Sequence, residues 1–240
     1  RTKVKKPVAL KFSIGDTIQT LQQQVSIEAS TVRPVESITI EAPVVFVGFG
    51  ASAPERDWDD YGNMDLNGKV AIYLVNDPDF AAKPDEPVAG RFGDRRMTYY
   101  GRWAYKYAEA ARRGAVAAFV IHETEAAGYG WNVASSSPGE SYAVVLDDTA
   151  TKPVTLQGWL NGDAAVNLFS SAGYNLAELR VRARSPDFEA FELKSVTFAA
   201  EFSVKLETIE SSNVLAKLPG TSRPDEVLMV TSHWDAYGHG

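Results

Sequence analysis

The sequence predicts a mixed α/β fold of the α+β kind, and three observations lead to this prediction. Apolar and polar residues alternate along residues 8–14, as they do in half-buried strands. Two denser apolar runs, 42–50 and 69–75, are typical of strands buried on both faces. Residues 98–114 instead repeat their apolar positions with helical spacing, and the apolar run 115–121 follows at once. Strand, helix and strand in this order predict a βαβ-like unit.

The first third of the chain is expected to hold strands and tight turns. Residues 1–41 predict two or three antiparallel strands, because their alternation breaks at Gly15-Asp16 and at Arg33-Pro34. Three Asp residues lie among two aromatic residues in 56–62, which fits either a cation site or a solvated turn. The spacing of a calcium loop is missing there, so the solvated turn is favoured.

A long surface loop is expected over residues 76–96, where three prolines interrupt regular structure. Four arginines lie in or beside it: Arg91, Arg95, Arg96 and Arg102. They could face the carboxylates of a substrate, or they could balance the nearby Asp residues on a solvated surface, and the second interpretation is favoured.

Thr98 is expected to cap the following helix, and Gly114 is expected to end it in the left-handed conformation. Its buried stripe is expected to comprise Trp103, Tyr107, Ala110 and Ala111. His122, at the end of the next strand, lies beside Glu123 and Glu125 and invites a catalytic interpretation. A structural or loop role is favoured, because no second His and no evident nucleophile lie near it in sequence.

Further strands are predicted over residues 142–146, 179–183 and 196–204, on their apolar or alternating patterns. Between the first two, residues 153–160 lead to a helix that Asp163 is expected to cap. The chain contains no Gly-x-Ser-x-Gly nucleophile elbow and no phosphate-binding loop motif.

Composition excludes several classes of function. The 24 basic and 31 acidic residues give a net charge of −7 with no basic block, which argues against a nucleic-acid partner. No apolar run approaches the roughly 18 residues of a membrane-spanning helix. The absence of cysteine excludes disulfides and thiolate metal sites.

A short apolar run, 227–231, is followed by His233 and Asp235. Ligands bind at the carboxyl ends of strands in open α/β sheets. In an extended chain, residues two apart point to one side, so His233 could bind a metal while Asp235 accepts its other ring N–H. A polar turn at the end of a strand is the alternative, because so short a spacing also arises by chance.

Residues 211–226 read Ser-Ser-Asn-Val-Leu-Ala-Lys-Leu-Pro-Gly-Thr-Ser-Arg-Pro-Asp-Glu. With the run that follows and Ser-His-Trp-Asp, they resemble the opening of the catalytic domain in the zinc metallopeptidase family of bacterial aminopeptidases and glutamate carboxypeptidase. The resemblance implies that His233 is the first ligand of a co-catalytic two-zinc centre and that Asp235 is the catalytic acidic residue that orients it. It implies further ligands and a general-base Glu beyond Gly240, and it assigns no role to His239.

Residues 43–205 resemble a protease-associated domain of the kind inserted in these peptidases. The motifs are Val-Val-Phe-Val-Gly-Phe-Gly from Val44, Asp-Leu-Asn-Gly-Lys-Val from Asp65, Met-Thr-Tyr-Tyr-Gly-Arg-Trp from Met97, and Leu-Gln-Gly-Trp-Leu from Leu156. The resemblance implies a small β-barrel-like sheet with a few helices, which caps the active site and restricts the peptides that enter.

The expected organisation is therefore N-terminal flanking strands over 1–41, a protease-associated domain over 42–206, and the start of a zinc peptidase domain over 207–240. The resemblance implies an aminopeptidase-type exopeptidase with two zinc ions, a peptide substrate, the remaining peptidase domain as partner, and a periplasmic or secreted location. The alternative is a stand-alone protease-associated module that binds peptides or proteins without catalysis. Because a catalytic zinc needs about three protein ligands, we expect these 240 residues alone to be inactive.

Overall fold

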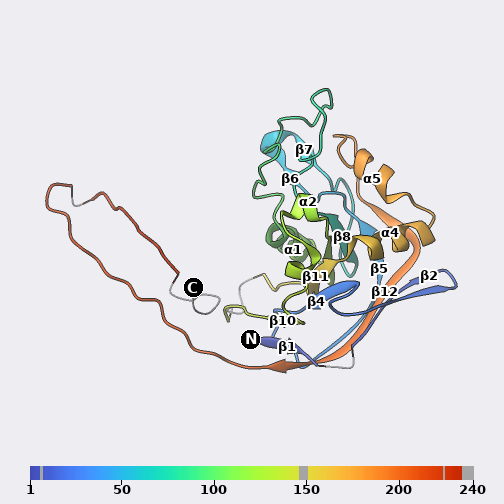
Figure 1. The fold of residues 1–240 in the computed structure, drawn as a ribbon, viewed down its shortest axis with the longest axis horizontal. Coiled ribbons are helices and arrows are strands. Elements are labelled where there is room, and N and C mark those ends of the chain that lie inside the picture. The colour runs from blue at the N-terminus through green and yellow to red at the C-terminus, as the bar shows by residue number, and fades with distance from the viewer. Residues whose placement is uncertain (6–7, 146–150, 224, 234–240) are drawn as a thin grey trace. The chain divides into compact units, whose positions relative to one another are not determined.

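The computed structural model describes residues 1–5, 8–145, 151–223 and 225–233 (Figure 1). The chain divides into two units, Arg1–Thr208 and Ile209–Gly240. The first unit includes both the residues that we assign to flanking strands and those that we assign to a protease-associated domain, and that assignment stays a prediction. No helix of the described residues is long and apolar enough to span a membrane.

The elements of the first unit are, in chain order, β1 (Thr2–Val4), β2 (Ala9–Ile14), β3 (Thr17–Leu21), β4 (Ile27–Ser30), β5 (Ser37–Phe46), β6 (Ser52–Ala53), the 3₁₀ helix η1 (Pro54–Arg56), β7 (Trp58–Asp59), β8 (Val70–Leu74), α1 (Trp103–Arg112), β9 (Ala117–Ile121), α2 (Thr124–Ala127), α3 (Trp131–Ala134), β10 (Glu140–Ser141), β11 (Leu156–Leu160), α4 (Gly162–Ser171), α5 (Leu176–Arg182) and β12 (Phe191–Leu206).

Ten of the described strands form one mixed sheet, which confirms the predicted α+β class. Its main path is β10-β1-β12-β5-β8-β9-β11-β4, and β2 pairs with both β12 and β3. Strands β5, β8, β9 and β11 run parallel, with Val70 opposite Val44 on one side and Ala117 on the other. Helix α1 connects β8 to β9, so the predicted βαβ unit is confirmed.

The central strands β8 and β9 are buried at every position. On one face, Ile72 and Phe119 belong to a hydrophobic cluster that includes residues of α4 and α5. On the other face, Tyr73 and Val120 pack in a second cluster with residues of α1, among them Tyr107. Helices therefore cover both faces of the parallel strands, as sheets of this kind require (Figure 1).

The long strand β12 connects the parallel strands to the N-terminal strands. It pairs antiparallel with β5, with β2 and, at its end, with β1. Its register against β5 shifts between Glu192 and Thr197, and Ser195 has a φ of 58° there. The carbonyl of Ser195 accepts a hydrogen bond from the N–H of Gly15 at 3.0 Å, so the irregular stretch is tied to the β2–β3 turn.

Helix α1 begins later than the sequence predicts. Its N-cap is Arg102, which makes no side-chain cap hydrogen bond. Thr98 instead donates its backbone N–H and its hydroxyl to the carboxylate of Asp77, at 2.5 and 2.8 Å. Trp103, expected in the buried stripe, is 46% exposed. The predicted end of the helix is correct, because Gly114 lies just beyond it with a φ of 78°.

The strand predicted over residues 179–183 is wrong, because these residues lie in α5 and the residue after it. The side chain of Asn175 caps this helix by accepting hydrogen bonds from the N–H groups of Ala177 and Glu178. The cap of α4 is likewise Asn161, whose side chain accepts from the backbone N–H of Asp163, the residue that we expected to be the cap.

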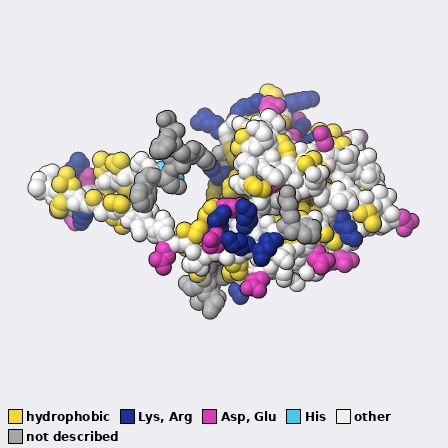
Figure 2. All heavy atoms as spheres, turned by 60° about the horizontal axis from the view of Figure 1, so that its bottom comes forward, with side chains coloured by type: hydrophobic (Ala, Val, Ile, Leu, Met, Phe, Trp, Pro, Cys, Tyr) yellow, Lys and Arg dark blue, Asp and Glu magenta, His cyan; other side chains and the backbone are white. Residues whose placement is uncertain are grey.

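Two further strand predictions are also wrong in the described part of the chain. Residues 142–145 form no strand and are exposed, and residue 146 lies outside the described residues. In the second unit, residues 227–231 form neither helix nor strand. Leu215, Leu218 and Leu228 are each more than 90% exposed, and Figure 2 shows hydrophobic side chains on the surface of this segment. Strands are stable only beside a hydrogen-bonding neighbour, and these runs have none among the described residues.

A buried ammonium group holds the long loop before α1. Lys106 is 0% exposed and donates to the carbonyls of Phe49, Asn76 at 3.1 Å and Tyr100 at 3.2 Å. Burial lowers the pKa of Lys106 to about 8, and the carboxylates of Asp77 and Asp60 oppose this shift. The ammonium thereby fixes three chain segments that are distant in sequence.

The turn over residues 56–62 is solvated at Asp57 and Asp59, as expected, whereas Asp60 is buried. It is 1% exposed and accepts hydrogen bonds from the N–H of Ala51 and from the indole N–H of Trp58, both at 2.9 Å. Burial raises the pKa of Asp60 to about 7. One side of the turn, with Trp58, Asp60 and Tyr61, therefore packs into the core.

We predict that limited digestion of the chain with thermolysin cuts first within residues 214–230. Thermolysin cleaves before apolar residues, and those of this segment are exposed without regular hydrogen bonding. Mass spectrometry of early products identifies the sites. First cuts inside Ala117–Ile121, where every residue is buried, would contradict the prediction.

We predict that Lys106→Met lowers the free energy of unfolding by about 3–5 kcal/mol, since it leaves buried carboxylates without their charged partner and three carbonyls without a donor. Urea denaturation measures the change. Lys11→Met, on an exposed position of β2, is the matched control and should stay within about 0.5 kcal/mol of the parent. Equal stability of the two variants would show that Lys106 does not hold the loop.

Candidate ligand-binding cavity

The predicted metal site lies largely outside the residues that the structure describes. His233 is exposed and lies outside helices and strands, whereas Asp235 and His239 lie outside the described residues. Within the described ranges, no three His, Cys, Asp or Glu side chains come close enough together to hold a metal ion. The role of His233 and Asp235 in a two-zinc centre, which needs about three protein ligands for each catalytic zinc, stays a prediction.

His122 is a packed residue of the first unit. It is 4% exposed, and its Nε2 lies 2.9 Å from the carbonyl oxygen of Tyr129, to which it donates. Its ring contacts those of Tyr129, Trp131 and Trp159, and burial lowers its pKa. These contacts occupy the imidazole in packing, in keeping with the favoured structural role.

The four loop arginines do not act as one group. Arg91 donates to the carbonyls of Pro87, Arg56 and Asp57, whereas Arg95 forms an ion pair with Glu125 at 2.7 Å. Arg96 and Arg102 are exposed. On the face drawn in Figure 2, basic and acidic side chains are interspersed with hydrophobic ones.

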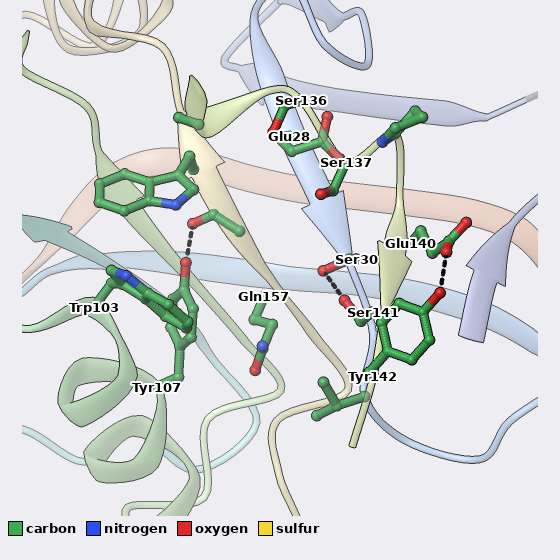
Figure 3. Close-up of a pocket in the computed structure, with 15 residues that line it drawn as sticks. Glu28, Ser30, Trp103, Tyr107, Ser136, Ser137, Glu140, Ser141, Tyr142 and Gln157 are labelled. Carbon is green, nitrogen blue, oxygen red and sulfur yellow. Dashed lines mark hydrogen bonds between the residues drawn. The ribbon is translucent and has the colours of Figure 1, made fainter. Parts of the chain in front are cut away.

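A cavity of about 680 Å³ lies between β4, α1, β11 and the segment 134–142 (Figure 3). Strands β4 and β11 pair antiparallel, with Glu28 opposite Trp159 and Ser30 opposite Gln157. Opposite residues share a face, and residues two apart along a strand do as well, so these four side chains lie on one side of the sheet. The sheet thus places a carboxylate, a hydroxyl, an amide and an indole in one wall.

The close pairing of β4 and β11 in this wall requires a glycine at position 158. A Cβ on Gly158 would lie 1.9 Å from the carbonyl oxygen of Glu28, so no side chain fits between the two strands there. The carbonyl of Gly158 accepts a hydrogen bond of 2.7 Å from the hydroxyl of Tyr107, which anchors α1 beside the cavity (Figure 3). Trp103, one turn earlier on α1, also lines the cavity.

Glu28 is the buried carboxylate of this cavity, with 6% of its surface exposed. Its Oε1 accepts hydrogen bonds from the N–H of Gly139 at 2.6 Å and from the side-chain amide of Gln23 at 3.1 Å. Its Oε2 is buried and has no hydrogen-bond partner among the described residues. Burial raises the pKa of Glu28 to about 7, and the two hydrogen bonds partly offset this effect.

Glu140, at the other end of the lining, is in the opposite electrostatic situation. The guanidinium of Arg1 binds it through two hydrogen bonds of 2.9 and 3.0 Å, and the hydroxyl of Tyr142 donates to it at 2.7 Å. Hydrogen bonding from Arg1 and Tyr142 lowers the pKa of Glu140 to about 2. The carboxylate of Glu140 is therefore fully paired, whereas Oε2 of Glu28 has no partner among the described residues.

The lining offers carboxylate, hydroxyl, amide and indole groups that can bind a polar ligand. Ser30 and Ser141 hydrogen-bond to each other at 2.9 Å (Figure 3), and no His, Cys or Lys lies among the described residues of the lining. A hydroxyl without an adjacent base is a weak nucleophile. The volume falls within the roughly 300–1,000 Å³ typical of ligand pockets.

Sequence reasoning missed this cavity. Glu28 lies within the predicted flanking strands, and its burial depends on Gly139, which is 111 residues away. Trp103 was expected to be in the core and instead is partly exposed at the cavity. The cluster of serine and glycine in residues 135–139 was the only local sign that a polar loop closes over the sheet here.

No protein-family model matches the chain, and no curated relative matches it. Among solved structures, the chain is similar to an aminopeptidase from Aneurinibacillus sp. strain AM-1, with a TM-score of 0.41 and 17% sequence identity. The match covers 86% of this chain and 33% of the aminopeptidase chain, so the chain spans about a third of that length.

We predict that stability falls as pH rises from about 5 to 7, and that Glu28→Gln reduces this loss by about 2 kcal/mol. The pKa of Glu28 is raised to about 7 from its usual 4.5, so in this window the folded chain keeps a proton that the unfolded chain releases. Asp60 contributes a loss of the same sign, whereas His122, whose pKa burial lowers, contributes a gain in stability as pH rises; both contributions remain in the variant.

Urea denaturation at pH 5, 6, 7 and 8 measures this loss. Glu41→Gln, at an exposed position of β5, is the matched control and should keep the parent's dependence on pH. A Glu28→Gln variant with the same pH dependence as the parent would show that Glu28 ionises normally in the folded chain.

Proposed function

We propose that this chain is part of a zinc-dependent exopeptidase of the aminopeptidase type, in which residues 42–206 form a protease-associated domain that influences peptide access. The structural observation that supports this role is the cavity beside β4 and β11, because its lining offers groups for recognition and no catalytic pair. The peptidase assignment itself is supported by the sequence pattern of residues 211–235.

Within this proposal, His233 is a zinc ligand and Asp235 accepts the other ring N–H of that imidazole. The carboxylate would fix the orientation of the ring and increase its basicity as a ligand. The other ligands of the two zinc ions, and the general base, are proposed to come from residues outside these 240. Peptide binding and the periplasmic or secreted location belong to the same proposal.

A second candidate is a stand-alone protease-associated module that binds peptides without catalysis. The observation that favours it is the ligand count, since the described residues bring no three potential metal ligands together. The two candidates share the cavity and differ in the role of His233.

In a longer protein that carries the complete ligand set, we predict that His233→Ala removes one zinc. Asp235→Asn should retain zinc and lower turnover by roughly 10- to 100-fold, because it perturbs only the residue that orients the ligand. Elemental analysis and rates with aminoacyl anilides measure the two effects. Ser232→Ala, which changes the adjacent residue, is the control and should leave both unchanged.

If His233→Ala retains both metals and full activity, the His-x-Asp pattern is a polar turn and the peptidase proposal loses its sequence support. If the longer protein binds no zinc while the cavity binds peptides, the stand-alone module is the correct function.

A further inference from the structure

The charged residues of the cavity lining are all acidic. Glu28 and Glu140 are among its described residues, and no Lys or Arg is. Aromatic rings from Trp103, Tyr107 and Trp159 line the same space. Carboxylates combined with the faces of aromatic rings are the groups that bind organic cations in proteins.

One cation of the chain is already bound at the edge of this lining. The guanidinium of Arg1 is hydrogen-bonded to Glu140 and lies 5.9 Å from the centre of the Tyr142 ring. Lys3 also approaches Glu140, at 3.5 Å. This arrangement pairs a cation with a carboxylate and an aromatic ring. Of the two carboxylates in the lining, Glu28 is the one that can still accept a hydrogen bond from a further donor.

The atom of Glu28 that can accept a further hydrogen bond is Oε2. This oxygen is buried with no hydrogen-bond partner among the described residues, whereas Oε1 is held by Gly139 and Gln23. Glu28 is one of the residues that line the cavity, so its unpartnered oxygen lies on a side chain that a bound ligand can approach. A buried acceptor without a donor is costly, and a donor from a ligand would remove that cost.

We infer that the cavity binds the primary ammonium group of a peptide, with Glu28 as its counter-ion and Trp103 against its carbon chain. This inference rests on the proposed role of the cavity in peptide recognition. The ammonium could belong to a lysine side chain or to the amino terminus of a peptide, because both present the same three donors to a carboxylate.

The test uses the full 240-residue chain and three probes built on one scaffold. N-acetyl-L-lysine methylamide carries a side-chain ammonium, L-norleucine methylamide carries an α-ammonium, and N-acetyl-L-norleucine methylamide carries none. Binding is measured by calorimetry at pH 8, above the pKa of about 7 that burial gives Glu28, so that the carboxylate is ionised. We expect at least one ammonium probe to bind about tenfold or more tightly than the neutral probe, and the preferred one identifies the source of the cation.

Two variants assign the effect to residues. Glu28→Gln should abolish the preference for the ammonium probes, and Glu41→Gln should preserve it. Trp103→Ala should weaken the ammonium probes about 2- to 5-fold. Tyr99→Ala removes another exposed aromatic side chain, outside the lining, and should have no effect. Because Trp103 is 46% exposed, Trp103→Ala should leave the chain folded. It therefore tests the cavity even if Glu28→Gln is too unstable to measure.

The outcomes separate this inference from the proposed function. Equal binding of all three probes that Trp103→Ala weakens and Glu28→Gln leaves unchanged would overturn the cation site while peptide recognition by the cavity stands. Binding of none of the probes would remove the recognition role as well as the inference. A preference for ammonium that survives both variants would place the cation site elsewhere on the chain and overturn the inference.

Discussion

The fold depends on covering both faces of β8 and β9, because every side chain of these two strands is buried. Helices α4 and α5 contribute to the core on one face, and α1 contributes to the core on the other. On the second face, α1 covers the sheet only as far as β11 and β4. There the hydroxyl of Tyr107 donates to the carbonyl of Gly158, and Trp103 is partly exposed. The cavity lies where α1 stops covering the sheet, so its position follows from the packing of the core.

Polar groups inside this core have a structural role that apolar groups could not fill. The Lys106 ammonium can donate three hydrogen bonds, and the loops around it offer three carbonyls that lack strand partners. Asp77 balances its charge and also binds Thr98, so the polar contacts continue along the loop into α1. Glu28 differs from this network because one of its oxygens is left without a donor. That difference is why we assign Lys106 to the fold and Glu28 to a site.

The sequence predicts the elements whose signals are local. The buried strands β8 and β9 follow from dense apolar runs, and the end of α1 follows from Gly114, which adopts a φ that other residues avoid. Residues 179–183 were misassigned because Leu-Arg-Val-Arg-Ala fits a period of two, while Leu176 and Leu179 supply the helical spacing that buries α5. Glu28 could not have been identified, because its burial depends on a loop more than a hundred residues away.

The same distinction applies to the apolar run that precedes His233. A helix satisfies its backbone groups internally, whereas a strand needs a neighbour for every hydrogen bond that it makes. Residues 227–230 have a strand-like sequence but are between 77% and 93% exposed, and no strand among the described residues pairs with them. Metal ligands must be held to within about 0.5 Å by rigid supporting structure. If His233 and Asp235 bind zinc as we propose, strands that pair with this run would hold them in place, and the same strands would bury the apolar residues that it exposes.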